Sequence, residues 1–260
     1  MQLISQKDGT ILTNGSGYHF MEIIGHRGAR KEAPENTVES FMHAQNNGCL
    51  HFELDVRLSS DRSLMVYHDK TLKRTSGIKR KVIATSSKVL RHTDARFNTP
   101  GWPKPCYIPL LKDVVDAVPN TLSWQFEVKP DSHYNMKVII KKLSHFIMKH
   151  KLNNKVVATS SSKWFLKEMK RFSPHIKTGY VAAHKLHRPV STCIALDCDL
   201  LVLHEELISP SLLRHAELES IEVSCWTVNE LDRMMYLKDL GIKSLITDIP
   251  TTAIKHFAKP

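Results

Sequence analysis

Two acidic residues stand two positions apart in the apolar segment Phe52–Val56, and this spacing suits metal chemistry. Alternate side chains of a β-strand point to opposite faces, so Glu53 and Asp55 would share one face. Two neighbouring carboxylates repel each other and are costly to bury unless a positive charge lies between them. Oxygen ligands favour a hard cation such as Mg²⁺ or Ca²⁺. For this motif alone, a strand with a solvated acidic face is the simpler alternative.

Two histidines follow short apolar segments. His26 comes directly after residues 21–25 and is followed by Arg27, whereas His68 comes directly after residues 64–67. Imidazole exchanges protons near neutral pH, and guanidinium is a fixed cation, so these ends could supply acid–base chemistry and anion binding. An ordinary surface turn is the simpler alternative for each motif alone.

A further carboxylate lies in the predicted strand Thr121–Lys129. Gln125, Glu127 and Lys129 occupy alternate positions and would share one face of it. A buried ion pair between Glu127 and Lys129 is the structural interpretation of this spacing.

The order of these motifs resembles the glycerophosphodiester phosphodiesterase family. The resemblance covers about residues 21–255, and the chain departs from the family pattern at Leu50 and Arg62, neither of them a catalytic position. The residues that carry it are His26-Arg27-Gly28, Pro34-Glu35-Asn36-Thr37, Glu53-Leu54-Asp55-Val56, His68-Asp69, Leu72, Arg74, Thr75, Ile108-Pro109-Leu110, Glu127-Val128-Lys129-Pro130, Trp226-Thr227-Val228-Asn229 and Thr247-Asp248-Ile249-Pro250.

The resemblance implies release of sn-glycerol 3-phosphate and an alcohol from small glycerophosphodiesters such as glycerophosphocholine and glycerophosphoethanolamine. His26 is expected to be the base and His68 the acid, although the reverse order stays open. The first nucleophile, water or the glycerol 2-hydroxyl, also stays open. The resemblance also implies one Mg²⁺ or Ca²⁺ ion held by Glu53, Asp55 and Glu127. Arg27 and Lys129 are implied to contact the phosphate. Trp226 is implied to contact the glycerol, and a place in the barrel core is an equal alternative for it.

The alternation of apolar strands and helices predicts a (β/α)8 TIM barrel over residues 21–257, with the chemistry at the C-terminal strand ends. Residues 1–20 are turn-rich and are expected to form an N-terminal arm. The barrel rhythm is interrupted at about residues 70–120, and the resemblance implies that this stretch is a cap-like insertion after the second barrel strand. A plain structural loop is the alternative. The expected barrel strands are 21–25, 52–56, 121–129, 155–159, 177–181, 200–203, 221–226 and 244–247.

Three helix boundaries are predicted from capping signals and periodicity. Asn36 is the expected N-cap of the first helix, with Glu39 three residues later. A second helix is expected at about residues 134–150. A late helix is expected to begin at Asn229 and to end before Gly241.

The composition indicates the cellular location of the protein and the kind of partner that it binds. The net charge of +11 suits anionic ligands, but basic residues are spread along the chain, so we expect a small-molecule substrate and no nucleic acid. No signal peptide and no stable membrane insertion are expected, because neither a cationic start with an apolar core nor a long apolar run is present. The five cysteines lack a paired motif and indicate reduced thiols, hence a cytoplasmic location. The oligomeric state stays open.

Two other functions remain as alternatives. One is a lyase of the sphingomyelinase D or lysophospholipase D type that forms a cyclic phosphate. The other is a non-catalytic barrel that binds anions through its positive charge. Three converging carboxylates argue against the second, because they would repel phosphates unless a metal were present.

Overall fold

The computed structural model describes residues 10–11, 21–99, 101–184 and 188–258. Of the predicted N-terminal arm, only β1 (Thr10–Ile11) lies among these residues, and it pairs antiparallel with the start of β2 (Met21–His26). The remainder of the arm lies outside the described residues.

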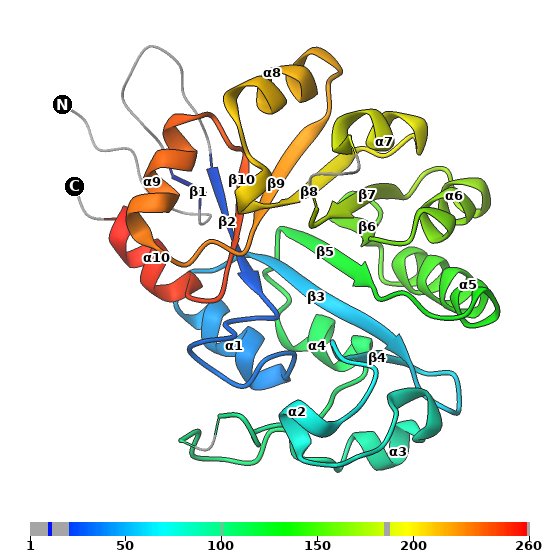
Figure 1. The fold of residues 1–260 in the computed structure, drawn as a ribbon. Helices are drawn as coiled ribbons and strands as arrows, with labels where there is room; N and C mark the ends of the chain where they lie inside the picture. The colour runs from blue at the N-terminus through cyan, green and yellow to red at the C-terminus, as the bar shows by residue number, and fades with distance from the viewer. Residues whose placement is uncertain (1–9, 12–20, 100, 185–187, 259–260) are drawn as a thin grey trace.

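A closed parallel barrel forms the centre of the molecule (Figure 1). The last barrel strand pairs in parallel with β2, and β2 pairs in parallel with β3 (His51–Leu58), so the sheet closes on itself. The barrel prediction is confirmed, and the predicted strand ends agree with the observed ones to within two residues. The remaining barrel strands are β5 (Ser123–Val128), β6 (Val156–Ser160), β7 (Lys177–Ala182), β8 (Leu200–His204), β9 (Glu222–Trp226) and β10 (Ser244–Thr247).

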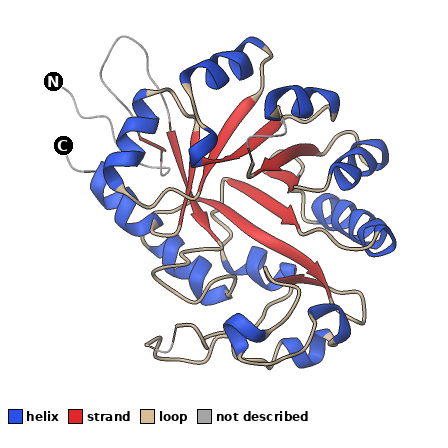
Figure 2. Ribbon diagram, viewed as in Figure 1, coloured by secondary structure: helices blue, strands red, loops and turns tan. Residues whose placement is uncertain are grey.

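Helices surround the strands as an outer layer (Figure 2). In α5 (His133–Lys149) the buried residues Met136, Ile139, Ile140 and Leu143 recur at helical spacing and face the barrel. The other elements of the layer are α1 (Val38–Asn46), α4 (Leu111–Ala117), α6 (Lys163–Phe172), α7 (Pro189–Ala195), the short 3-10 helix η3 (Glu205–Leu207), α8 (Pro210–Leu218), α9 (Leu231–Asp239) and α10 (Pro250–Phe257).

Two predicted helix starts are wrong. Thr37, not Asn36, caps α1, since its Oγ1 accepts a hydrogen bond from the Ser40 amide at 3.2 Å. Asn36 has a left-handed backbone with φ 57°, and its side chain is directed to the barrel instead. The late helix, α9, begins at Leu231 rather than Asn229, because Asn229 bonds to the loop after β10.

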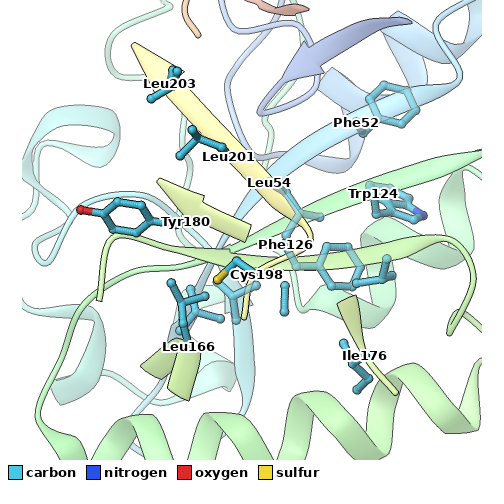
Figure 3. Packing of buried hydrophobic residues seen from close by; sticks show 14 of the residues in the cluster. Phe52, Leu54, Trp124, Phe126, Leu166, Ile176, Tyr180, Cys198, Leu201 and Leu203 are labelled. Atoms are coloured by element: carbon cyan, nitrogen blue, oxygen red, sulfur yellow. The ribbon is translucent and has the colours of Figure 1, made fainter. Parts of the chain in front are cut away.

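The main core lies between the strands and the helices. Phe52, Trp124 and Phe126 are fully or almost fully buried, and neighbouring rings lie 5.4 and 5.6 Å apart (Figure 3). Each such side chain stabilises the fold by about 1.5–3 kcal/mol relative to exposure. Because Phe52 faces the helices, strand alternation turns Glu53 toward the barrel axis.

The strand that precedes His68 is not a barrel strand. β4 (Leu64–Val66) pairs antiparallel with β3, with Val66 opposite Val56. The expectation that the chemistry lies at the C-terminal ends of the barrel strands is therefore wrong for His68, which follows a hairpin strand. The hairpin reverses the chain, and the Tyr67 amide donates to the Asp55 carbonyl at 2.9 Å, so His68 returns to the barrel mouth.

An insertion follows this hairpin and contains α2 (Lys73–Ser76), the 3-10 helix η1 (Val82–Ala84) and α3 (Ser87–Leu90) (Figure 1). It has a small core of its own. The helix α4, within the range expected for the insertion, packs into the main core through Leu111 and Val114. The residues of the small core are Met65, Tyr67, Leu72, Val82, Leu90, Ala95 and Ile108.

Candidate active site

A tight turn at the end of β2 sets the first side of the site. Arg27 and Gly28 both have left-handed backbones, with φ 53° and 87°. A Cβ on Gly28 would lie 2.5 Å from Ser40 Oγ, so only glycine fits against α1. The Arg27 amide donates to the Glu53 carbonyl at 3.0 Å and to Glu53 Oε2 at 3.2 Å. The turn is thereby fixed to the acidic strand.

His26 is buried and held by a carboxylate from the last strand end. Its Nδ1 lies 2.6 Å from Asp248 Oδ1, and Asn229 Nδ2 donates to Asp248 Oδ2 at 3.0 Å. Burial opposes ionisation of Asp248, but the bond to His26 brings the pKa of Asp248 down to about 2. Burial lowers the pKa of His26, and Asp248 partly offsets this. The neutral ring thus carries its proton on Nδ1 and keeps a lone pair on Nε2.

Three carboxylates meet at the barrel mouth. Glu53, Asp55 and Glu127 can each place one oxygen within 4.8 Å of the others, and no histidine belongs to this group. Asp55 and Glu127 are register neighbours on β3 and β5, which explains why residues far apart in sequence converge. Burial and the charges of Asp55 and Glu127 raise the pKa of Glu53 well above its usual value.

Two cations balance part of this charge. Lys129 Nζ lies 2.9 Å from Asp55 Oδ1 and 2.7 Å from Glu127 Oε1. Arg27 Nε lies 3.1 Å from Asp55 Oδ2. Burial alone would raise the pKa of Asp55, but Lys129 and Arg27 hold it below its usual range. The ion pair between Glu127 and Lys129, which was the structural alternative, is present, and it lies within the acidic group rather than apart from it.

The donor set fits a hard divalent cation. Glu53 Oε1 is buried and has no partner among the described residues, whereas Asp55 Oδ1 is paired with Lys129 Nζ. A buried carboxylate oxygen rarely stays without a partner, so a coordinated cation is the natural partner for Glu53 Oε1. Oxygen ligands without histidine or thiolate suit Mg²⁺ or Ca²⁺ better than Zn²⁺.

His68 has a carboxylate partner of its own. Its Nδ1 lies 2.6 Å from Asp69 Oδ1, and Arg74 Nε donates to Asp69 Oδ2 at 2.7 Å. With 32% of its side chain exposed, His68 is more open to solvent than His26, with 7%. Burial lowers the pKa of His68, whereas the charge of Asp55 raises it.

A buried acidic residue connects the two sides of the mouth. Glu35, 5% exposed, accepts from Arg27 Nη1 at 2.7 Å and from Arg74 Nη2 at 2.9 Å. Burial would raise the pKa of Glu35, but the bonds from Arg74 and Arg27 lower it to about 2. This pairing fixes both guanidinium groups beside the carboxylates.

Six further residues support the site, and none of them was a predicted site residue. Asn36 Nδ2 donates to Asp55 Oδ2 at 2.7 Å, and Glu35 and Asp248 act as described above. All six belong to the motifs that carry the family resemblance, so their position inside a motif was the available signal. Their bonding partners depend on the fold. The six are Glu35, Asn36, Asp69, Arg74, Asn229 and Asp248.

These side chains surround a cavity of about 70 Å³ at the barrel mouth. Trp226 lies on its wall, packs against the apolar barrel interior, and has a buried Nε1 without a partner among the described residues. All the predicted site residues line the cavity except Asp55, which is fully buried and contacts Arg27 and Lys129. The lining residues are His26, Arg27, Glu53, His68, Gln125, Glu127, Lys129, Thr159, Val181, Val202, Trp226 and Ile246.

Comparisons with known proteins identify the family of this chain. The family model of the glycerophosphoryl diester phosphodiesterase family matches residues 26–252. A glycerophosphodiester phosphodiesterase of Caldanaerobacter subterraneus is 27% identical over 91% of this chain and 98% of its own. The human lysophospholipase D GDPD1 is 26% identical over 88% of this chain and 83% of its own.

Solved structures share the fold. A phosphodiesterase from Oleispira antarctica, in complex with the product sn-glycerol-3-phosphate, has a TM-score of 0.84 at 22% identity and covers 91% of this chain and 96% of its own. Within the described part of this chain, no helix is both long and apolar enough to cross a membrane. The chain belongs to the glycerophosphoryl diester phosphodiesterase family and is an enzyme of the phosphoric diester hydrolase class.

Proposed function

We propose that this enzyme is a metal-dependent glycerophosphodiester phosphodiesterase that releases sn-glycerol 3-phosphate and an alcohol from small glycerophosphodiesters. The observation that carries the proposal is the convergence of three carboxylates and two carboxylate-bound histidines on one cavity. Support also comes from the relatives named glycerophosphodiester phosphodiesterase and from the product bound to the Oleispira enzyme.

Glu53, Asp55 and Glu127 would hold the cation, Mg²⁺ or Ca²⁺. When bound, it supplies positive charge to a phosphate oxygen and makes phosphorus more electrophilic. Lys129 neutralises the carboxylates behind the site, and Arg27 keeps Nη2 without a partner among the described residues. A guanidinium nitrogen at this place can donate to the phosphate while Glu35 fixes the remainder of the side chain.

The two histidines would move protons. Nε2 of His26 carries a lone pair and accepts the proton of the attacking hydroxyl, whether water or the glycerol 2-hydroxyl. His68, nearer to solvent, donates a proton to the departing alkoxide. An anionic phosphodiester beside His68 raises the pKa of this imidazole and favours its protonated form. Trp226 offers its indole N–H to the glycerol hydroxyls.

A lysophospholipid is the second candidate substrate. Relatives named lysophospholipase D favour it, as do exposed apolar residues on the insertion, which could contact an acyl chain. They are Ile78, Val89, Phe97 and Tyr107. With a lysophospholipid as substrate, the enzyme would release the headgroup alcohol and leave the acyl chain on the phosphate product, or it would form a cyclic phosphate.

We also propose a cytoplasmic location, supported by five cysteines that are all buried and free of disulfides. This location suits a small soluble diester better than a lipid in a membrane.

The test is release of glycerol 3-phosphate from glycerophosphocholine and glycerophosphoethanolamine, with Mg²⁺, Ca²⁺ or EDTA. We expect release that requires a metal and that Glu53→Gln abolishes, whereas Glu168→Gln on the outer face of α6 keeps it. No release with any metal from folded protein would reject the proposal. Turnover of a choline lysophospholipid alone would favour the second candidate, and the phosphate product, cyclic or open, would then separate lyase from hydrolase.

A further inference from the structure

A second cavity, of about 250 Å³, lies beside the candidate active site. Three of its lining residues stand two positions after a site residue: Arg57 follows Asp55, Lys70 follows His68, and Asp131 follows Lys129. Asp55 and Arg57 both belong to β3, and residues at positions i and i+2 of a strand share a face, about 7 Å apart along it. The full lining is Arg57, Leu58, Lys70, Lys81, Val82, Ile83, Asp131 and Ser132.

Arg57 is a buried cation in this cavity. It is 8% exposed, and its only hydrogen bond to a described residue runs from Nε to the His68 carbonyl, at 2.7 Å. No described carboxylate forms an ion pair with it. The other buried cations of the mouth, Arg27 and Lys129, each contact two carboxylates. The terminal nitrogens of Arg57 bond to no described residue and are not fully buried, so they can donate to a ligand in the cavity.

Two lysines add to this charge. The backbone holds Lys70 and Lys81 side by side, because the Val82 amide donates to the Lys70 carbonyl at 3.0 Å and Thr71 bridges to Lys81. Both lysines line the cavity, and neither forms an ion pair with a described residue. The backbone positions of the two lysines are therefore fixed, while both side chains are exposed.

The acidic groups near the cavity are already engaged. Asp131 is the one carboxylate of the lining, and its Oδ1 accepts from the Ser132 amide at 2.6 Å and from Asn135 Nδ2 at 2.9 Å. Asp55 and Glu127 are paired with Lys129, and Asp69 is paired with Arg74. Three cations and one carboxylate thus face the cavity. The carboxylate, that of Asp131, already accepts hydrogen bonds from residues at the start of α5.

We propose that this cavity binds a second anionic group, a phosphate or a carboxylate, on the alcohol half of the substrate. The inference rests on the proposed function, in which His68 faces the leaving alcohol, and the cavity adjoins His68 through both Arg57 and Lys70. The spacing of about 7 Å between Asp55 and Arg57 along the strand matches an anion separated from the scissile phosphate by a short alcohol such as glycerol. The fork of Arg57 and the two ammonium groups can bind three oxygens of one phosphate.

The probe pair is glycerophosphoglycerol and the same diester with a phosphate on its leaving glycerol. With Mg²⁺ present, we expect wild-type kcat/KM to favour the phosphorylated diester. Lys81→Gln and Lys70→Gln should each reduce this preference about tenfold, the effect of losing about 1.4 kcal/mol of binding energy. Lys79→Gln, which removes the same charge from a neighbouring exposed position outside the cavity, should keep the preference.

Calorimetric titration of the same two diesters onto the magnesium-loaded enzyme separates this inference from the reaction itself. If neither diester is hydrolysed but the phosphorylated one binds more tightly through Lys70 and Lys81, the proposed phosphodiesterase activity is rejected and the proposed anion site is supported. Equal affinities for the two diesters, together with heat of inorganic phosphate binding that Lys81→Gln removes, would assign the site to free phosphate. Equal affinities with no such phosphate binding, or a preference that Lys81→Gln leaves intact, would overturn the proposal.

Discussion

Nδ1 of His26 lies 2.6 Å from Oδ1 of Asp248, although 222 positions separate the two residues. The bond joins the first barrel strand end to the last, at the place where the barrel closes. Asp248 fixes the tautomer of His26, and Asn229 fixes Asp248. The proposed base is therefore oriented by a residue that barrel closure brings to it.

Loss of the Asp248 carboxylate should impair proton transfer. We expect Asp248→Asn to lower kcat by about 10²-fold or more with little change in KM, because His26 loses both its orientation and its charged partner. The active base is the neutral ring, so activity falls as the pH drops through the pKa of His26, which lies below 6.5. Since Asp248 raises this pKa, the acidic limb of the pH profile should move to lower pH in the variant.

Asp239→Asn, at an exposed position of α9, is the matched control and should keep both kcat and the pH profile. An Asp248→Asn enzyme with wild-type kcat and the same acidic limb would show that Asp248 has no part in positioning the base.

Metal removal should reduce thermal stability, because the repelling carboxylates lose their shared partner. At a metal concentration 100 times Kd, binding stabilises by about 2.7 kcal/mol, which corresponds to a Tm increase of about 5 °C or more for a chain of this size. Calorimetry with Mg²⁺, Ca²⁺ and EDTA measures the shift. Glu127→Gln should abolish most of this Tm shift. Glu22→Gln, at the N-terminal start of β2 and away from the barrel mouth, should keep it. An unchanged Tm under all three conditions would argue against the metal site.

Glu35 should contribute strongly to stability at neutral pH. Glu35→Gln leaves the buried Arg27 guanidinium without its closest carboxylate, and removing one partner of a buried pair costs about 3–5 kcal/mol. The folded pKa of Glu35 is about 2, below the unfolded value, so its contribution is complete above about 4.3 and is lost as the pH falls toward 2.

Urea unfolding at several pH values tests this contribution. The difference in free energy of unfolding between wild type and Glu35→Gln should be constant near pH 7 and should shrink below pH about 4.3. Glu39→Gln, a change of the same kind on α1, serves as the control. A difference that is small at pH 7, or that does not depend on pH, would contradict the buried pairing.

The indole N–H of Trp226 should serve substrate binding. We expect Trp226→Phe, which keeps an aromatic ring but removes the unpartnered donor, to raise KM about tenfold with a smaller effect on kcat. Trp164→Phe, where the indole stacks on His133 outside the cavity, is the control. If KM is unchanged in Trp226→Phe, Trp226 acts only as a core residue of the barrel.

The sequence alone determined the barrel and the motif residues. Strand and helix periodicity follows from local alternation of apolar residues, so segments such as Phe52–Val56 could be placed to within two residues. The same alternation put Glu53 and Asp55 on one face. Glu127 was assigned to them from the family resemblance, and the parallel register of β3 and β5 brings it there.

Only the tertiary structure decided how the supporting residues pair. Asn36 carried the signal of a helix cap but donates to Asp55, and His68 reaches the mouth through an antiparallel hairpin rather than a barrel strand. Likewise, no local pattern pairs His26 with Asp248. Such bonds join residues distant in the chain, and their energy depends on burial and on the orientation of the partner. Local periodicity contains neither quantity, so these contacts become defined only when the barrel closes.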